Sequence, residues 1–181
     1  MNPSLTLITG GVRSGKSRHA LELAQKIPSS GERIFIATAE ALDEEMKRRI
    51  ERHKAERAGT FRTVEEPVFL SRTLENIPLD VGVVVIDCMT LWISNLLCRE
   101  GTYRHDDEVR NFLTQLRERR FPLILVTNEV GLGIMPENSL ARRFMDELGS
   151  LNQRLAALAD EVVFMVSGLP MLLSKEVSHA R

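Results

Sequence analysis

Short, nearly continuous apolar runs alternate with longer stretches of helical periodicity along this chain. The apolar runs cover residues 5–9, 34–38, 81–86, 122–127 and 162–166. Because apolar and polar side chains do not alternate within them, these runs predict strands covered on both faces, as in a parallel sheet between helices. A weaker, alternating segment at residues 60–65 predicts an edge strand.

Apolar residues three or four positions apart predict helices between most of these strands. The helical patterns lie at residues 20–27, 41–57, 68–77, 89–98, 105–119 and 139–159. The alternation predicts a three-layer α/β fold with a mostly parallel sheet, in which ligands bind at the carboxyl ends of the strands. Residues 169–181 have no interpretation from their pattern.

Composition narrows the class of protein further. The 181 residues, 43% of them hydrophobic and 27% charged, suit a single domain over residues 1–181. The net charge of −1, with acids and bases interspersed, gives no sign of a nucleic-acid or membrane partner. Two cysteines outside any C-x-x-C pair, no apolar run of membrane-spanning length and no visible secretory signal predict a cytoplasmic protein.

One motif points to chemistry on its own. Residues 10–17 read Gly-Gly-Val-Arg-Ser-Gly-Lys-Ser, which matches the phosphate-binding pattern G-x-x-x-x-G-K-[S/T] between a predicted strand and a predicted helix. The glycines let main-chain N–H groups turn toward phosphate oxygens, and the helix start adds positive potential. The motif predicts that Lys16 reaches the β- and γ-phosphates and that the Ser17 hydroxyl binds Mg²⁺.

Polar residues directly after two other predicted strands are further candidates. Asp87 follows four apolar residues, the usual arrangement for a carboxylate that holds Mg²⁺ directly or through water. Asn128 and Glu129 follow the next apolar run. This pair either contacts phosphate or a second substrate, or caps the following segment, and the sequence favours neither role.

A charged helical stretch at residues 41–57 carries a histidine in an unusual place. At 100° per residue, His53 lies about 20° from Leu42 and from Met46 around the helix axis, so it points with the apolar stripe. The spacing alone favours a histidine buried in the core. The alternative is a positioned imidazole that acts as base or nucleophile near a nucleotide.

Several blocks together resemble the adenosylcobinamide kinase / adenosylcobinamide-phosphate guanylyltransferase family. The blocks are residues 9–18, 36–39, 43–46, 49–54, 126–131 and 152–156, and they occur in the family's order over almost the whole chain. The resemblance implies ATP- or GTP-dependent phosphorylation of adenosylcobinamide, and then transfer of GMP from GTP to adenosylcobinamide phosphate. It also implies a homotrimer.

The resemblance assigns roles to particular residues. It makes His53 the histidine that carries GMP covalently, and Arg52 stands where some relatives have a second histidine. From the phosphate-loop motif, Lys16 is the other predicted catalytic residue and Ser17 a predicted Mg²⁺ ligand. Asp87, from its place after a strand, is the second predicted Mg²⁺ ligand or orients a hydroxyl, and the sequence does not separate these roles. The implied nucleotide contacts are Gly10, Gly11, Val12, Arg13, Ser14, Gly15, Lys16, Ser17, Ala37, Thr38, Ala39, Lys54, Ala55, Glu56, Arg57, Glu65 and Asp87.

Two other functions are compatible with the phosphate-binding motif. One is a small-molecule kinase with a single activity, which forms no acid-labile adduct with GMP. The other is a nucleotide-dependent switch or assembly ATPase, which modifies no small molecule. Neither needs a histidine at position 53, and the block around it therefore argues against both.

Overall fold

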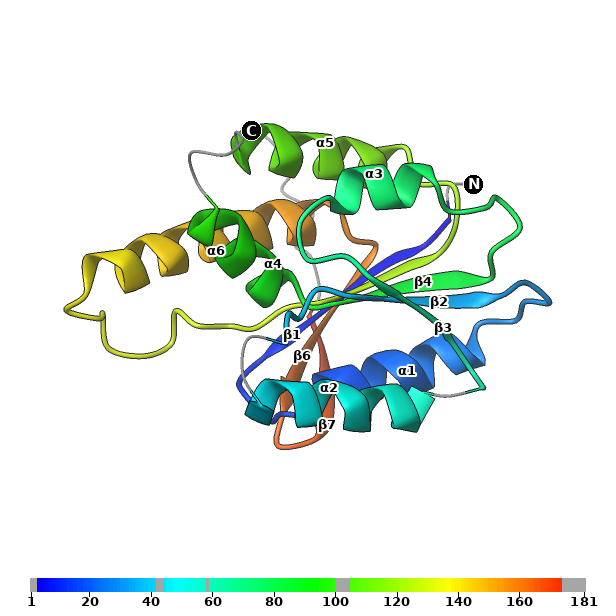
Figure 1. Ribbon diagram of the computed structural model, residues 1–181, viewed down its shortest axis with the longest axis horizontal. Helices are drawn as coiled ribbons and strands as arrows, with labels where there is room; N and C mark the ends of the chain where they lie inside the picture. The colour runs from blue at the N-terminus through cyan, green and yellow to red at the C-terminus, as the bar shows by residue number, and fades with distance from the viewer. Residues whose placement is uncertain (1–2, 42–43, 58, 100–104, 174–181) are drawn as a thin grey trace.

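A computed structural model describes residues 3–41, 44–57, 59–99 and 105–173 of the chain. Within the helix Glu44–Arg57 it describes only the main chain at residues 45, 46, 49, 52, 53 and 56. The described chain forms one seven-stranded sheet with helices on both faces (Figure 1). The strands are β1 (Leu5–Gly10), β2 (Arg33–Ala37), β3 (Arg62–Glu65), β4 (Val83–Asp87), β5 (Leu123–Val126), β6 (Glu161–Val166) and β7 (Leu169–Leu173).

The strand order is β3-β2-β4-β5-β1-β6-β7, and every neighbouring pair is parallel except β6 and β7. The helices are α1 (Lys16–Lys26), α2 (Glu44–Arg57), α3 (Leu70–Glu75), α4 (Met89–Cys98), α5 (His105–Arg117) and α6 (Ser139–Leu158). The predicted three-layer fold is therefore confirmed, and the predicted edge strand lies at the edge as β3.

Two apolar clusters hold the layers together, one on each face of the sheet. Leu7 and Leu125 pack under α3, α4, α5 and α6, whereas Ile8 and Val126 pack against Ala20 of α1. Figure 1 shows α1 and α2 together on the second face. The buried, non-alternating strands follow from this double cover, because each strand must present apolar side chains to both layers.

Strand β7 was not predicted from the sequence. It pairs antiparallel with β6 through a two-residue turn at Ser167 and Gly168, both with positive φ (52° and 85°). Pro170 is tolerated because β7 is the last strand of the sheet, where one side needs no ladder hydrogen bonds. The uninterpreted segment thus begins as a strand, and residues 174–181 lie outside the described residues.

No helix in the described part of the chain is both long enough and apolar enough for a membrane crossing.

Candidate functional site

The phosphate-loop motif forms a bend between β1 and α1. Arg13 and Gly15 both have positive φ, 55° and 95°, and Gly15 is the residue before the first turn of α1. Within the described part of the chain, no side chain caps that helix start. Because the first N–H groups of a helix lack partners within the helix, this end of α1 can donate to phosphate oxygens.

Gly10 cannot be replaced without a shift of the main chain. Its φ is 144°, and a Cβ at this position would lie 2.4 Å from the carbonyl oxygen of Met165 on β6. The turn between β6 and β7 also contacts the loop, since the N–H of Gly168 donates to the carbonyl of Ser14 over 3.0 Å. The N–H of Glu129, which follows β5, donates to the carbonyl of Gly10 over 3.1 Å, so the loop is held from both sides of its strand.

Lys16 lies buried in the mouth of this loop. Its Nζ donates to the carbonyl of Gly11 and lies 3.5 Å from Oγ of Ser14. Burial lowers the pKa of Lys16, while the nearby charge of Asp87 acts in the opposite direction. Asp87 ends β4, which is separated from β1 by β5 alone, and Ser17 is the next residue along α1.

The predicted residues at the strand ends lie in one row. Glu65 is level with Ala37, and Ala37 is level with Asp87 on the other side. The same level continues through Val126 on β5 to Ile8 on β1. We call these five residues the strand-end row. At about 4.8 Å per strand, it extends about 19 Å from β1 to β3.

A buried hydroxyl holds the middle of this row. Thr38 is fully buried, and its Oγ1 donates to the carbonyl of Cys88 and accepts from the Cys88 N–H, at 2.7 and 2.8 Å. Its N–H also donates to the carbonyl of Asp87. Asn95 of α4 donates to the Thr38 carbonyl over 2.8 Å. These bonds fix the main chain on which the Asp87 carboxylate is carried.

The carboxyl-terminal turn of α2 is anchored against the same row. Lys54 forms an ion pair with Glu65. The guanidinium of Arg57 is buried over the ring of Phe35 on β2, 3.7 Å from the ring centroid. His53 precedes Lys54 in this helix, but its side chain, those of Met46 and Glu56, and all of Leu42 lie outside the described residues. The predicted orientation of His53 therefore stays a prediction.

For the pair at the end of β5, the structure shows the capping role that the sequence left open in one of the two residues. Glu129 accepts from the N–H of Gly131 over 2.8 Å and so caps the following turn. Asn128 is held by its main chain alone: Thr90 of α4 accepts from its N–H, and Asn152 of α6 donates to its carbonyl. Sequence reasoning missed the supporting residues Asn95 and Asn152, although both are polar residues on helices with strong apolar stripes.

Comparison with known proteins gives a consistent result. The protein-family model described as "Cobinamide kinase / cobinamide phosphate guanyltransferase" matches residues 6–173. The chain is 46% identical over 171 residues to the bifunctional adenosylcobalamin biosynthesis protein CobP of Pseudomonas aeruginosa, with 94% of this chain and 97% of that protein covered. The resemblance predicted from the sequence is confirmed.

Two further relatives are named bifunctional adenosylcobalamin biosynthesis protein CobU. The one from Salmonella typhimurium is 39% identical over 178 residues, and the one from Escherichia coli 40% over 181. Each alignment covers 91% of this chain and 97% of the relative. Among solved structures, the flagellar accessory protein FlaH of Methanocaldococcus jannaschii has the same fold at 16% identity, with a TM-score of 0.53 over 95% of this chain and 78% of that one.

Proposed function

This chain belongs to the cobinamide kinase / cobinamide phosphate guanyltransferase family, and we propose that it performs both reactions on adenosylcobinamide. In the first, the hydroxyl oxygen of the aminopropanol arm bonds to the γ-phosphorus of ATP or GTP. The bond to the bridging oxygen breaks, the nucleoside diphosphate leaves, and the hydroxyl proton passes to water. In the second reaction, the new phosphate receives GMP from GTP, with pyrophosphate as the other product.

The kinase step depends on position and charge rather than on covalent chemistry. The N–H groups at the start of α1 bind the phosphates, and the ammonium of Lys16 neutralises charge that develops on them. Ser17 and Asp87 would hold Mg²⁺, because both offer the oxygen ligands that this ion prefers, Ser17 follows Lys16 in the chain and the charge of Asp87 acts on Lys16. When bound, Mg²⁺ further neutralises the phosphate oxygens.

The guanylyl step is assigned to His53. A ring nitrogen of the neutral imidazole bonds to the α-phosphorus of GTP, and the bond from that phosphorus to the β-phosphate oxygen breaks. A phosphate oxygen of adenosylcobinamide phosphate then displaces the imidazole and releases it neutral. The observation that carries this assignment is the Lys54–Glu65 ion pair, which fastens the turn of α2 next to His53 onto the strand-end row.

Labelling tests this assignment directly. The purified protein is incubated with GTP labelled at the α-position, and acid-labile, base-stable label on the protein is measured. His53→Ala should abolish the label and retain kinase turnover. His19→Ala is the matched control, because His19 lies in the first turn after the phosphate loop yet has no assigned role. Full labelling of His53→Ala, or loss of label only in His19→Ala, would refute the nucleophile.

The homotrimer is a separate proposal, supported by an exposed apolar strand. All five residues of β7 are exposed, and four of them are large and apolar, at 45–70% exposure: Leu169, Met171, Leu172 and Leu173. An apolar edge strand of this kind needs a cover, and contact with other copies of the chain provides one.

We also propose that both reactions take place in the cytoplasm. The cysteines, Cys88 and Cys98, are free, as is usual in that reducing compartment.

A further inference from the structure

Strand β5 occupies a position that the proposed mechanism does not yet use. It lies between β1, which leads into the phosphate loop, and β4, which ends in Asp87. Ile8 is level with Val126, and the N–H of Glu129 continues this ladder by donating to the carbonyl of Gly10 over 3.1 Å. Asn128 is therefore level with Gly10, one strand spacing of about 4.8 Å from the start of the loop.

The side chain of Asn128 faces the same side of the sheet as Asp87. Ile124 and Val126 pack in the cluster on the α1 face, whereas the hydroxyl of Thr127 donates to Asn152 of α6 on the opposite face. Since side chains alternate along a strand, Asn128 returns to the α1 face. Asp87 reaches this face by the same alternation, because Val83 and Val85 also belong to that cluster.

Hydrogen bonds fix the main chain of Asn128, while its carboxamide remains available to bond to a ligand. Thr90 accepts from its N–H over 2.9 Å, and Asn152 donates to its carbonyl over 3.0 Å. Among the residues that the structure describes, the carboxamide has no hydrogen-bond partner, and the residue is only half-buried. A half-buried amide on a rigid main chain is a preorganised donor for a bound group.

We propose that the carboxamide of Asn128 contacts the terminal phosphate of the bound nucleoside triphosphate. This inference rests on the proposed function, in which the phosphate loop and Lys16 hold the β- and γ-phosphates of the nucleotide. The γ-phosphate then lies at the mouth of the loop, next to the ends of β1 and β5. Nδ2 donates to an oxygen of the γ-phosphate, and Oδ1 remains free to accept from the hydroxyl that receives it.

Comparison of GTP with GDP tests the contact without any corrinoid. Binding of each nucleotide, with Mg²⁺, is measured for the wild type, Asn128→Ala and Asn128→Asp. Loss of a hydrogen bond to a charged group should weaken GTP binding about 10- to 100-fold in Asn128→Ala, with GDP binding changed less than about threefold. Asn128→Asp should weaken GTP binding further, because a carboxylate repels the phosphate.

Asn111→Asp is the matched control. It makes the same change of charge on the exposed surface of α5 and should alter neither affinity. Unfolding midpoints close to wild type are expected for Asn128→Ala and Asn128→Asp, because the main-chain bonds remain. Should Asn128→Ala not fold, Asn128→Asp, which keeps the shape of the side chain, decides the question alone.

The outcomes separate this contact from the function on which it rests. If the Asn128 variants keep the wild-type ratio of GTP to GDP affinity, or lose both nucleotides equally, the contact is refuted while nucleotide binding by the family site stands. If the wild type binds neither nucleotide, the proposed function fails and this contact fails with it. At saturating GTP, Asn128→Ala should also lose at least tenfold in kinase turnover while labelling through His53 changes less than threefold.

Discussion

The two edges of the parallel sheet differ in what their polar residues do. At the carboxyl edge, main-chain groups are fixed by Thr38, Thr90 and Asn152, Lys16 lies in the phosphate loop, and Asn128 is level with Gly10 at the start of that loop. At the amino edge, charged side chains bond to the protein itself. The residues at the amino edge stabilise the fold, whereas the side chains at the carboxyl edge are positioned by the fold.

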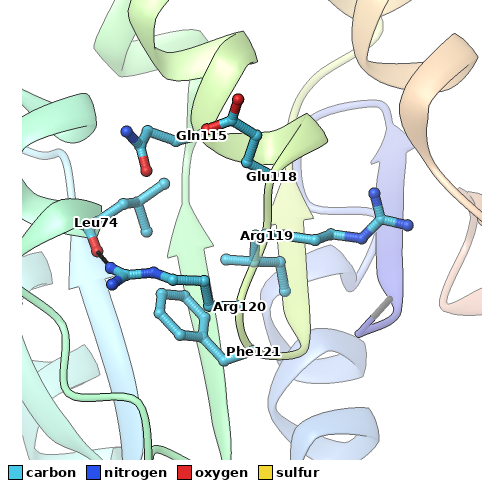
Figure 2. Close-up of a pocket in the computed structure, with 7 residues that line it drawn as sticks. Leu74, Gln115, Glu118, Arg119, Arg120 and Phe121 are labelled. Atoms are coloured by element: carbon cyan, nitrogen blue, oxygen red, sulfur yellow. Dashed lines mark hydrogen bonds between the residues drawn. The ribbon is translucent and has the colours of Figure 1, made fainter. Parts of the chain in front are cut away.

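At the amino edge, Arg119 is an example of a charged residue that stabilises the fold. Arg119 donates to the carbonyls of Pro3 and Leu116 and to both carboxylate oxygens of Asp160, which in turn accepts from the N–H of Leu5. Figure 2 shows Arg119 and Arg120 extending in opposite directions around a small cavity.

Arg120 bonds to the carbonyl of Leu74 on α3, and the cavity between the two arginines measures only about 10 Å³. A space of this size holds about one water molecule. These two arginines therefore link β1, the start of β6 and the helices, and their bonds are made within the protein.

Replacement of Lys16 should give the largest effect and should act on function alone. Lys16→Ala removes the ammonium that neutralises the phosphates, and we expect kinase kcat/KM to fall by about 10³-fold. The free energy of unfolding should stay within about 1 kcal/mol of wild type, because a buried charge is removed together with its bonds. Steady-state kinetics and urea unfolding measure the two quantities.

Lys26→Ala is the control for this prediction, since Lys26 is exposed at the other end of the same helix. It should leave kinetics and stability unchanged. A Lys16→Ala protein that keeps more than a tenth of wild-type kcat/KM would contradict the role assigned to the carboxyl edge.

Replacement of Arg119 should give the reverse result at the amino edge. Arg119→Ala leaves the carbonyl of Pro3 without its donor and Asp160 without its partner, and we expect unfolding to cost about 2 kcal/mol less. Nucleotide affinity should change less than twofold. Arg117→Ala, at an exposed arginine in the last turn of α5, two residues before Arg119, should change stability by less than about 0.5 kcal/mol.

A loss of nucleotide affinity in Arg119→Ala, at temperatures where the protein stays folded, would show that Arg119 at the amino edge also supports nucleotide binding. It would contradict the assignment of stability to one edge and binding to the other.

The sequence predicted the parts of the fold that depend on local pattern. Apolar runs and the loop motif placed the five central strands, α1 and Asp87, because burial on both faces and phosphate binding impose local residue choices. The hydrogen bonds that hold the strand ends could not be predicted in this way. Thr38 and Asn95 are 57 positions apart, and only the strand order brings α4 beside that turn.

Strand β7 escaped prediction for a different reason. Every one of its residues is exposed, and it therefore lacks the alternation that identifies a half-buried strand. The usable signal was the dipeptide Ser167-Gly168 directly after an apolar run, since small residues with positive φ favour two-residue hairpin turns. This turn matters to the site because Gly168 bonds to the phosphate loop.

Replacement of Gly168 tests whether the hairpin turn supports the loop. A Cβ would meet only ordinary contacts there, so Gly168→Ala should lose about 1 kcal/mol of stability from its φ of 85°. The distorted turn should also weaken GTP binding a few-fold. Gly59→Ala has a similar φ of 80° in open space and should match the stability loss with unchanged GTP affinity.

Equal GTP affinity in the two alanine variants would mean that the turn at Ser167 and Gly168 does not help to shape the loop.

The buried carboxylate of Glu108 lies between α3 and α5. Its replacement gives the smallest of the expected changes in stability. Glu108 accepts from both the N–H and the hydroxyl of Ser71 at 2.8 Å, so both of its carboxylate oxygens bond within the protein. Burial raises the pKa of Glu108 above its ordinary value, although the bonds to Ser71 oppose this. The folded protein therefore retains this proton at pH values where the unfolded chain has released it.

The sign of the pH dependence follows from that raised pKa. The contribution of Glu108 to stability is fully present below the ordinary glutamate pKa and is lost as the pH rises through the raised value in the folded state. Glu108→Gln keeps a partner for Ser71 without a titrating group. The variant should match wild type in acid and become more stable than wild type, by up to about 1 kcal/mol, toward neutral pH.

Urea unfolding from pH 4 to 8 measures this difference. The control is Glu118→Gln, at an exposed position near the end of α5, whose free energy of unfolding should change with pH as that of wild type does and so run parallel to it. If Glu108→Gln also runs parallel, burial does not control the titration of Glu108, and its bonds to Ser71 outweigh the cost of a buried charge.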